Sequence, residues 1–254
     1  MFRELHHQRD PLILCNVWDA ASAIIAEKLG YQAVGTSSAA IATSQGKTDG
    51  QNTDFETLLT VVKQISEVTT LPLTVDIESG YADTPQEVVD NIAKLADLKV
   101  VGINIEDSHL IDGHRTLVDK HVFTKNLSQI KTLLNDANIE MFINVRSDTY
   151  IVDAETALPE TIDRIRLYET VGADGIFLPC LTAPDDIAKI VAHSSLPLNV
   201  MCMPKLAGFE QLKQLGVKRI SMGNFVYDNM LAHLEDTMLC IKQQGSFEPL
   251  HFSD

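Results

Sequence analysis

Acidic side chains stand directly after two neighbouring apolar runs in the middle of the chain, and a third run ends on an arginine. The first run ends LTVDIESGY with Asp76 and Glu78, the next ends INIEDS with Glu106, and the third ends INVRSD with Arg146. Asp76 and Glu78 are two residues apart, so on an extended chain they point to the same side. If the runs are adjacent parallel strands, their acidic ends converge and repel one another unless a cation lies between them. Asp76, Glu78 and Glu106 are therefore the predicted metal ligands.

The types of ligand indicate which cation to expect. Carboxylate oxygens without His or Cys suit Mg²⁺, with Mn²⁺ as the second possibility, and such ions keep several waters that leave room for an anionic substrate. Arg146 is placed to hold a carboxylate or phosphoryl group through two parallel hydrogen bonds. The neighbouring Asp107 and Asp148 are more typical of helix caps or supporting residues than of ligands. Each acid taken alone could be a cap or a surface ion-pair partner, but their joint pattern favours a site.

The elements that must position these residues follow a regular alternation. Short apolar runs alternate with amphipathic helical patterns, and no Pro/Gly/Ser-rich linker interrupts them. The predicted strands cover residues 12–17, 32–35, 71–75, 100–105, 140–145, 175–178, 196–201 and 217–221. The predicted helices cover residues 20–29, 54–68, 84–98, 126–135, 154–171, 183–192, 207–215 and 224–243.

Strands that are apolar throughout, each followed by a helix, indicate a parallel sheet buried on both faces. Eight such units favour an α/β fold with a single (β/α)8 TIM-type barrel over an open doubly wound sheet, and we expect one domain over residues 1–254. The active site of such a barrel lies at the C-terminal ends of the strands, where the acidic residues stand. Two connections, 36–53 and 107–124, are longer than a barrel needs, and loops of this kind usually cover a site.

Composition excludes several classes of partner. Lys+Arg 20 against Asp+Glu 35 give a net charge of −15, which repels phosphate backbones and anionic lipid surfaces. No stretch approaches the ~18 apolar residues of a membrane span, and the N-terminal sequence has no signal pattern. We therefore expect a cytoplasmic protein with a small-molecule partner, bound neither to nucleic acid nor to a membrane.

The cysteines predict neither a zinc site nor a disulfide framework. Cys15, Cys180, Cys202 and Cys240 lie far apart, with no CxxC pair. Because free cysteine is often buried, we expect them to be mostly reduced packing residues.

Several segments of the chain resemble the isocitrate lyase and phosphoenolpyruvate mutase superfamily. The resemblance rests on TSSAAIATSQGKTDG, on VDIESGYADTP, which is similar to the family's DxDxGYG segment, on GINIEDS, on INVRSD and on LNVMCMPKLAGFEQLKQLGVKRISMGN. It implies a Mg²⁺-dependent barrel enzyme that makes or breaks C–C or P–C bonds next to the carboxylate of a 2-oxo acid or its enol. It also implies a homo-oligomer, a dimer or a tetramer, with helices swapped between subunits, although the C-terminal segment is short for a swapping arm.

The same resemblance implies a role for each acidic residue. Asp76 is then the principal metal ligand, and Glu78 and Glu106 complete the shell directly or through water. Arg146 is the catalytic residue that clamps the substrate carboxylate.

The small-residue segment supplies the other predicted contacts. By the resemblance, Ser37 and the backbone of Ser38 and Ala39 hold carboxylate or phosphoryl oxygens of the substrate. Asp49 lies over the reacting centre as a second catalytic residue.

Three departures from the family pattern narrow the chemistry. Glu78 is one methylene longer than the family's Asp, which changes direct ligation into water-mediated contact or the reverse. The loop after Glu106 reads EDSHLIDGHRTLVDK, without the cysteine of the lyases' KKCGH-like motif and without the mutases' K-x-N-S segment. A thiol-dependent isocitrate or methylisocitrate lyase is therefore not expected. His109 and His114 are the loop's candidate acid–base groups, although exposed histidines more often have no role.

The chain keeps the family's metal-binding and arginine positions but lacks the loop motifs of both branches. This combination favours a reaction that needs little proton delivery from the loop. We predict a Mg²⁺-dependent lyase similar to an oxaloacetate decarboxylase, in which the metal stabilises the enolate left by the departing CO₂. The first alternative is a phosphonomutase of the phosphoenolpyruvate mutase or hydrolase type, acting on an enol phosphate. A non-catalytic barrel that binds a 2-oxo acid is the second. A Schiff-base aldolase, the third, would need a strand-end lysine, for which Lys205 is the candidate.

Overall fold

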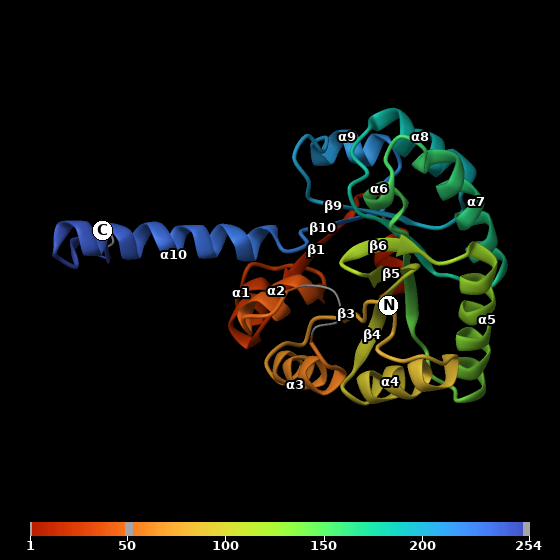
Figure 1. Ribbon diagram of the computed structural model, residues 1–254, viewed down its shortest axis with the longest axis horizontal. Coiled ribbons are helices and arrows are strands. Elements are labelled where there is room, and N and C mark those ends of the chain that lie inside the picture. The colour runs from red at the N-terminus through yellow and green to blue at the C-terminus, as the bar shows by residue number, and fades with distance from the viewer. Residues whose placement is uncertain (1, 49–52, 251–254) are drawn as a thin grey trace.

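The computed structural model describes residues 2–48 and 53–250, and its centre is a closed barrel of parallel strands (Figure 1). The strands run around the barrel in the order β1-β10-β9-β8-β7-β4-β3-β2. Their bounds are β1 Leu12–Val17, β2 Val34–Thr36, β3 Leu73–Asp76, β4 Val100–Glu106, β7 Phe142–Arg146, β8 Gly175–Leu178, β9 Leu198–Met201 and β10 Arg219–Ser221. Each predicted strand overlaps one of these, so the predicted (β/α)8 TIM-type barrel is confirmed. The single domain over residues 1–254 stays a prediction.

Helices follow the strands of the barrel, and all but the last of them cover its outside. Their bounds are α1 Ala20–Lys28, α3 Phe55–Ser66, α4 Pro85–Asp97, α5 Lys120–Asp136, α7 Ala157–Thr170, α8 Pro184–His193, α9 Phe209–Gln214 and α10 Phe225–Gln244. The largest error is at α5, which begins at Lys120 instead of residue 126. Asp119 starts the helix there, because its side chain accepts hydrogen bonds from the backbone N–H groups of His121 and Val122.

Helix α4 shows how the sequence fixes an element that supports the site. Thr84 and Glu87 form a capping box, in which each side chain accepts a hydrogen bond from the other residue's backbone N–H. Pro85 stands at the first helical position, where no N–H is needed. The apolar side of the helix, including Ile92 and Leu95, is buried against the barrel core. Asn91 of this helix also donates from Nδ2 to the Gly80 carbonyl at 3.1 Å, so α4 holds the turn that follows β3.

The two long connections contain structure that the sequence analysis left as loops. The first holds helix α2, Ser38–Ser44, with Ser37 as its N-cap. The second holds an antiparallel hairpin of β5, Ser108–Ile111, and β6, His114–Leu117. Asp112 and Gly113 make its turn with φ of 51° and 77°, as an Asp-Gly hairpin turn requires. Further short elements are α6 Thr149–Val152, η1 Arg3–His6 and η2 Glu248–Leu250.

The N-terminal ends of the strands are closed by the first residues of the chain. Phe2 packs there with Leu12, Leu14 and Phe142 in a buried cluster separate from the main core. The ring of His6 stacks on Phe142 with 4.3 Å between centroids. This apolar plug leaves the opposite, C-terminal end of the barrel as the open one.

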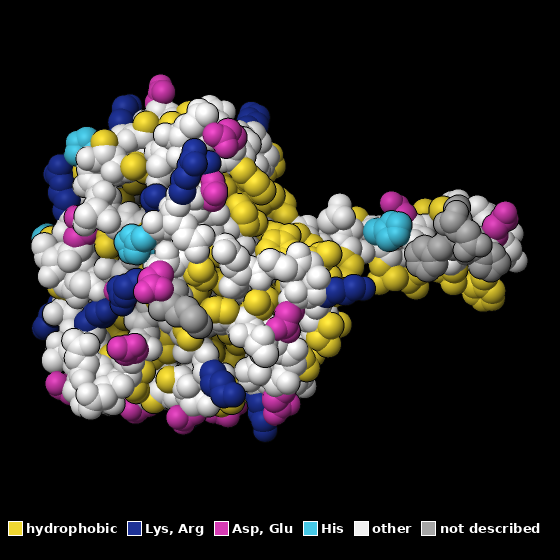
Figure 2. All heavy atoms as spheres, turned by 180° about the vertical axis from the view of Figure 1, so that it is seen from behind, with side chains coloured by type: hydrophobic (Ala, Val, Ile, Leu, Met, Phe, Trp, Pro, Cys, Tyr) yellow, Lys and Arg dark blue, Asp and Glu magenta, His cyan; other side chains and the backbone are white. Residues whose placement is uncertain are grey.

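Helix α10 extends away from the barrel as a single arm (Figure 1). Exposed apolar residues recur along it at every fourth position, namely Val226, Met230, Leu234 and Met238, and Figure 2 shows apolar side chains gathered along one side of the arm. This apolar stripe on α10 is exposed in the single chain. Within the described ranges, no helix is both long and apolar enough to cross a lipid bilayer.

The four cysteines are free. Cys15 and Cys180 are half-buried, whereas Cys202 and Cys240 are exposed. The prediction that the cysteines are packing residues is therefore wrong for Cys202 and Cys240. Cys202 follows the last residue of β9, and Cys240 lies on the projecting helix, where the barrel core does not reach.

Candidate active site

A cavity of about 130 Å³ opens at the C-terminal ends of the strands. The predicted residues in its wall are Ser37, Ser38, Ala39, Asp76 and Arg146. The structure therefore brings the predicted substrate-binding segment, the principal metal ligand and the predicted arginine clamp into one cavity.

Three other predicted residues are placed differently. Glu106 lines a second cavity, of about 150 Å³, that lies beside the first sections of α4 and α5. Glu78 is buried and is not part of the wall of either cavity. Asp49 lies outside the described residues.

Asp76 is held at the end of β3 by hydrogen bonds on both sides. Its Oδ2 accepts from Ser38 Oγ at 3.1 Å, and its backbone N–H donates to Thr36 Oγ1 at 2.9 Å. The two partner side chains, Thr36 and Ser38, come from the end of β2 and the start of α2. The small-residue segment after β2 therefore helps to hold Asp76 in place. The Asp76 carboxylate is fixed at the cavity wall with only 8% of the residue exposed.

Glu78 lies in a sharp turn and not on an extended strand. Its φ is 49°, and Gly80 follows with φ of 109°, where an added Cβ would lie 2.6 Å from Val88 Cγ2. The side chain of Glu78 accepts a hydrogen bond from Tyr81 at 3.0 Å, and its backbone carbonyl accepts from Glu106 N at 2.8 Å. Asp76 and Glu78 therefore do not lie on one extended strand, as the prediction assumed, because β3 ends at Asp76.

Glu106 belongs to a compact group of four buried or half-buried charges. Arg115 Nη1 lies 2.6 Å from Glu106 Oε1 and 2.7 Å from Asp148 Oδ2, and Arg146 lies 3.1 Å from Glu106 Oε2 and 2.7 Å from Asp148 Oδ1. Burial raises the pKa of Glu106 to about 7, and Asp148 adds to the rise, whereas Arg146 and Arg115 oppose it. We call Glu106, Arg115, Arg146 and Asp148 the paired cluster. Two cations and two anions compensate one another within it.

Arg115 reaches this cluster from the hairpin, and the sequence analysis missed it. The Asp-Gly turn is the signal that could have revealed it, because it predicts a hairpin and hence alternating inner and outer side chains. His109 and His114 are exposed, on the opposite face of the hairpin from Arg115, and His109 also lines the second cavity together with Glu106. Arg115, between His114 and Thr116, faces inward.

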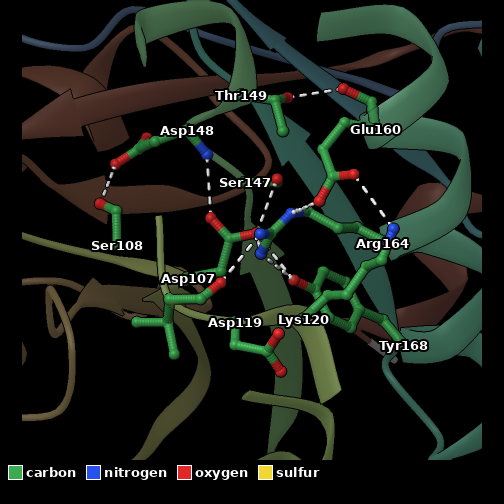
Figure 3. Close-up of polar contacts among 12 residues, drawn as sticks. Asp107, Ser108, Asp119, Lys120, Ser147, Asp148, Thr149, Glu160, Arg164 and Tyr168 are labelled. Carbon is green, nitrogen blue, oxygen red and sulfur yellow. Dashed lines mark hydrogen bonds and ion pairs between the residues drawn. The ribbon is translucent and has the colours of Figure 1, made fainter. Parts of the chain in front are cut away.

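A second buried network lies behind the paired cluster, centred on Asp107 (Figure 3). Figure 3 shows Ser147, Arg164 and Tyr168 pointing toward the Asp107 carboxylate. Ser147 and Tyr168 donate to it at 2.7 Å each, and Arg164 donates at 3.1 Å, while Asp148 N donates at 3.0 Å. Asp107 therefore ties the ends of β4 and β7 to α7. Of the two roles predicted for Asp107 and Asp148, helix cap or supporting residue, the contacts agree with the supporting role. Neither residue caps a helix through its side chain.

Polar residues also replace apolar ones inside the barrel below the cavity. Asn144 Nδ2 donates to Asn104 Oδ1 at 2.9 Å and to Asn199 Oδ1 at 3.2 Å, across the barrel interior. Gly175 makes room for this contact, since a Cβ there would lie 2.7 Å from Asn144 Oδ1. Arg219 lies at the same depth and lines the cavity. In the sequence, this layer is marked by an asparagine two positions before the charged residue that ends the strand. Asn104 precedes Glu106 in INIE, and Asn144 precedes Arg146 in INVR.

Lys205 does not support a Schiff-base site. It follows β9 in an exposed turn with φ of 71°, and it is not part of the cavity wall. The Schiff-base alternative therefore has no lysine at this cavity among the described residues.

The donor set at the cavity fits a hydrated Mg²⁺. In the described ranges, no three His, Cys, Asp or Glu side chains are grouped as a metal cage. Mg²⁺ does not require one, because it commonly binds through one or two carboxylates and keeps several waters. Asp76 provides such a carboxylate, and Glu106 is close enough for the two charges to interact.

The chain matches the family model described as phosphoenolpyruvate phosphomutase over residues 2–242. It is 34% identical to an uncharacterised protein of Mycobacterium tuberculosis, over 89% of this chain and 83% of the relative. It is 27% identical to an oxaloacetate decarboxylase of Pseudomonas entomophila, over 100% of this chain and 86% of the relative. A Burkholderia cenocepacia structure solved as a candidate phosphonomutase has a TM-score of 0.86 and 35% identity, over 92% of this chain and 96% of that one.

Proposed function

The chain belongs to the phosphoenolpyruvate phosphomutase family, and we propose that it is a Mg²⁺-dependent lyase that decarboxylates a small 2-oxo dicarboxylate such as oxaloacetate. Among its relatives are several proteins named oxaloacetate decarboxylase and one named 2-methylisocitrate lyase. The observation that carries the proposal is the cavity itself, whose wall contains Asp76, Arg146 and Arg219, and in which the charge of Asp76 acts on both guanidinium groups. His109 and His114 do not line it, which suits a reaction that needs no acid from the hairpin.

Mg²⁺ held by Asp76, with Glu106 contributing through water, would supply positive charge next to the carboxylate and keto oxygens of the substrate. Ser38 keeps the Asp76 carboxylate oriented through its 3.1 Å hydrogen bond. Arg146 donates hydrogen bonds from Nε and Nη2 to Asp148, and its Nη1 lies 3.1 Å from Glu106 Oε2. The N–H groups of its terminal nitrogens that are not used by Asp148 would be the donors for a substrate oxygen.

The proposed step balances without a further reactant. The bond between C3 and the distal carboxylate carbon breaks, CO₂ leaves, and the electron pair stays on the C2–C3 fragment as an enolate. One proton from water then adds to C3 and gives pyruvate. The chain's own contribution is to orient the acid and to offset the enolate charge.

Pyruvate formation from oxaloacetate tests this proposal. Purified protein is assayed with excess Mg²⁺ and again with EDTA, and the metal-only rate is subtracted because oxaloacetate decays in the presence of metal alone. We expect protein-dependent pyruvate that EDTA removes. The same assay with Mn²⁺ tests the metal preference. If oxaloacetate is untouched but raises the unfolding temperature, the non-catalytic binding barrel is the correct alternative.

A phosphonomutase is the second candidate, favoured by the matching family model and by the Burkholderia structure. Against it stands the loop 107–124, which lacks the K-x-N-S segment and forms the β5–β6 hairpin instead. Phosphorus NMR of phosphoenolpyruvate and phosphonopyruvate incubated with the protein decides between them. Interconversion of these two signals would favour the mutase.

We also propose that the chain forms a homo-oligomer, a dimer or a tetramer, through α10. The helix carries the apolar stripe of Val226, Met230, Leu234 and Met238, which is exposed in the single chain. Leu234→Asp should reduce the mass measured by light scattering to that of the monomer, and the matched change Ala232→Asp, at an exposed position on the opposite side of the helix, should not. A cytoplasmic location remains a prediction from the sequence.

A further inference from the structure

Arg219 is a buried cation with almost no hydrogen-bonding partners. The residue is 1% exposed. Its one hydrogen bond runs from Nη2 to Asn104 Oδ1 at 3.5 Å, while Nε and Nη1 have no partner among the described residues. A guanidinium has five N–H donors, so most of its hydrogen-bonding capacity is unused.

The other buried or half-buried arginines in the described chain are all ion-paired. Arg115 and Arg146 each contact Glu106 and Asp148, and Arg164 contacts Asp107. Arg219 has no carboxylate within ion-pair distance in the described ranges. Leaving a buried charge and its donors unpaired is costly, so such a group points to a partner that binds from outside.

Arg219 forms part of the wall of a cavity that an anion could occupy. Arg219 lines the same cavity as Asp76, Asn104 and Ser221. Burial lowers the pKa of Arg219 to about 9 and the charge of Asp76 opposes the decrease, so the guanidinium stays protonated at neutral pH. The charge of Arg146, in contrast, is already compensated within the paired cluster.

We infer that Arg219 is the counter-charge that binds the carboxylate a 2-oxo dicarboxylate retains, the one adjacent to the keto group. This inference rests on the proposed decarboxylation. An ion pair to the departing carboxylate would stabilise it relative to neutral CO₂ and would slow the reaction, since catalysis requires stronger binding of the transition state than of the substrate. An ion pair to the retained carboxylate carries no such penalty. Arg219 is therefore a specificity-determining residue for acids with a carboxylate next to the keto carbon.

Binding of oxalate tests the inference without turnover. Oxalate presents a carboxylate next to a second carbon–oxygen group, as the retained fragment does, and it has no carboxylate that leaves by this route. Its dissociation constant is measured by calorimetry at saturating Mg²⁺ for the wild type, Arg219→Met, Arg219→Lys and the matched control Arg166→Met. Arg166 is an exposed arginine on α7.

We expect Arg219→Met to weaken oxalate binding about ten- to a hundredfold, as the loss of a charge-assisted hydrogen-bonded pair does. Arg219→Lys should bind with intermediate affinity, because the ammonium keeps the charge and loses the planar fork. Arg166→Met should bind as the wild type does. Circular dichroism of each variant at the assay temperature establishes that it is folded.

Two results would overturn the inference. One is a wild type that does not bind oxalate, and the other is a folded Arg219→Met or Arg219→Lys variant that binds it with wild-type affinity. The proposed function fails separately. If oxalate binding depends on Arg219 but no pyruvate forms from oxaloacetate, the carboxylate subsite stands and the decarboxylation does not. If pyruvate forms and Arg219→Met leaves KM unchanged, the reaction stands and the subsite does not.

Discussion

The two sides of the barrel mouth handle buried charge in opposite ways. On the side of β4, β7 and the hairpin, each arginine of the paired cluster lies against a carboxylate. The same holds for Arg164 in the Asp107 network, which Figure 3 shows. On the side of β10 and β3, Arg219 has no ion pair in the described chain, and Asp76 lies at the wall of the cavity.

This difference separates the part of the mouth that holds the fold from the part that is prepared for a ligand. A buried ion pair loses much stability when one partner is removed, because the remaining charge is left uncompensated. A buried charge without a partner carries that cost already, so its removal should not lower stability but should weaken binding strongly. The predictions below test this contrast.

The largest effect on stability is expected at the centre of the Asp107 network. Arg164→Met leaves the Asp107 carboxylate buried without its cation and should lower the free energy of unfolding by about 3–5 kcal/mol. Urea unfolding measures it. Arg166→Met, on the exposed side of the same helix, should change the value by less than about 0.5 kcal/mol. Equal effects at the two positions would contradict a fold-holding role for the network.

A smaller loss is expected where a second arginine remains. Arg115→Met removes one of two cations from Glu106 and Asp148 and should cost about 2 kcal/mol, since Arg146 still pairs with both. Hydrogen exchange should also speed up in the hairpin that Arg115 anchors. His114→Ala, at an exposed site on the same strand, is the control. Unchanged exchange in Arg115→Met would show that the hairpin does not depend on this pairing.

The plug below the cavity should make stability depend on pH. Burial lowers the pKa of His6 from 6.5 to about 3, and the positive charge of Arg219 adds to the decrease. Below pH 6.5 the unfolded chain takes up a proton that the folded chain does not accept until about pH 3, so stability falls as pH falls through this window. Between pH 7 and pH 5 the loss from this group is about 2 kcal/mol.

Urea unfolding at several pH values checks this dependence against two variants. His6→Phe keeps a ring on Phe142 but cannot titrate, so its stability should fall less over the same window. Arg219→Met removes a like charge and should also reduce the slope. A wild-type slope identical to that of His6→Phe would show that His6 is not kept neutral by the fold.

The smallest effect on stability is expected on the ligand side. Arg219→Met replaces an unpaired buried cation by an apolar side chain and should change the free energy of unfolding by less than about 1 kcal/mol, in either direction. The same Arg→Met change at position 164 is the matched comparison. A loss of about 3 kcal/mol or more at Arg219 would mean that this residue also holds the fold.

The barrel was predictable because its signal is repeated and local. Eight apolar runs separated by amphipathic segments permit few folds, and strand ends such as Asp76 and Arg146 follow directly from that pattern. The placement of Glu78 was not predictable in this way. Its left-handed backbone conformation turns the chain immediately after β3, and the two-residue period holds only on an extended strand.

The sequence pattern also did not predict residues whose side chains reach across the barrel. Arg219 stands in the run VKRIS and reads as the start of a strand, and nothing local shows that its side chain reaches Asn104 on β4. The position of Arg115 depends on the β5–β6 hairpin, which lies in a segment that was expected to be a loop. Asp49 belongs to the predicted site but lies outside the described residues, so its catalytic role stays a prediction.

One measurement tests the contrast between the two sides most directly, by making the same change, Asp→Asn, at the ends of two adjacent strands. Unfolding free energy and Mg²⁺-dependent pyruvate formation from oxaloacetate are measured for Asp76→Asn and Asp107→Asn. We predict that Asp76→Asn lowers pyruvate formation at least about 100-fold and keeps its stability within about 1 kcal/mol. Asp107→Asn should lose about 3 kcal/mol or more and keep most of its rate per folded molecule. Wild-type turnover by Asp76→Asn, or a stability loss equal to that of Asp107→Asn, would contradict the account.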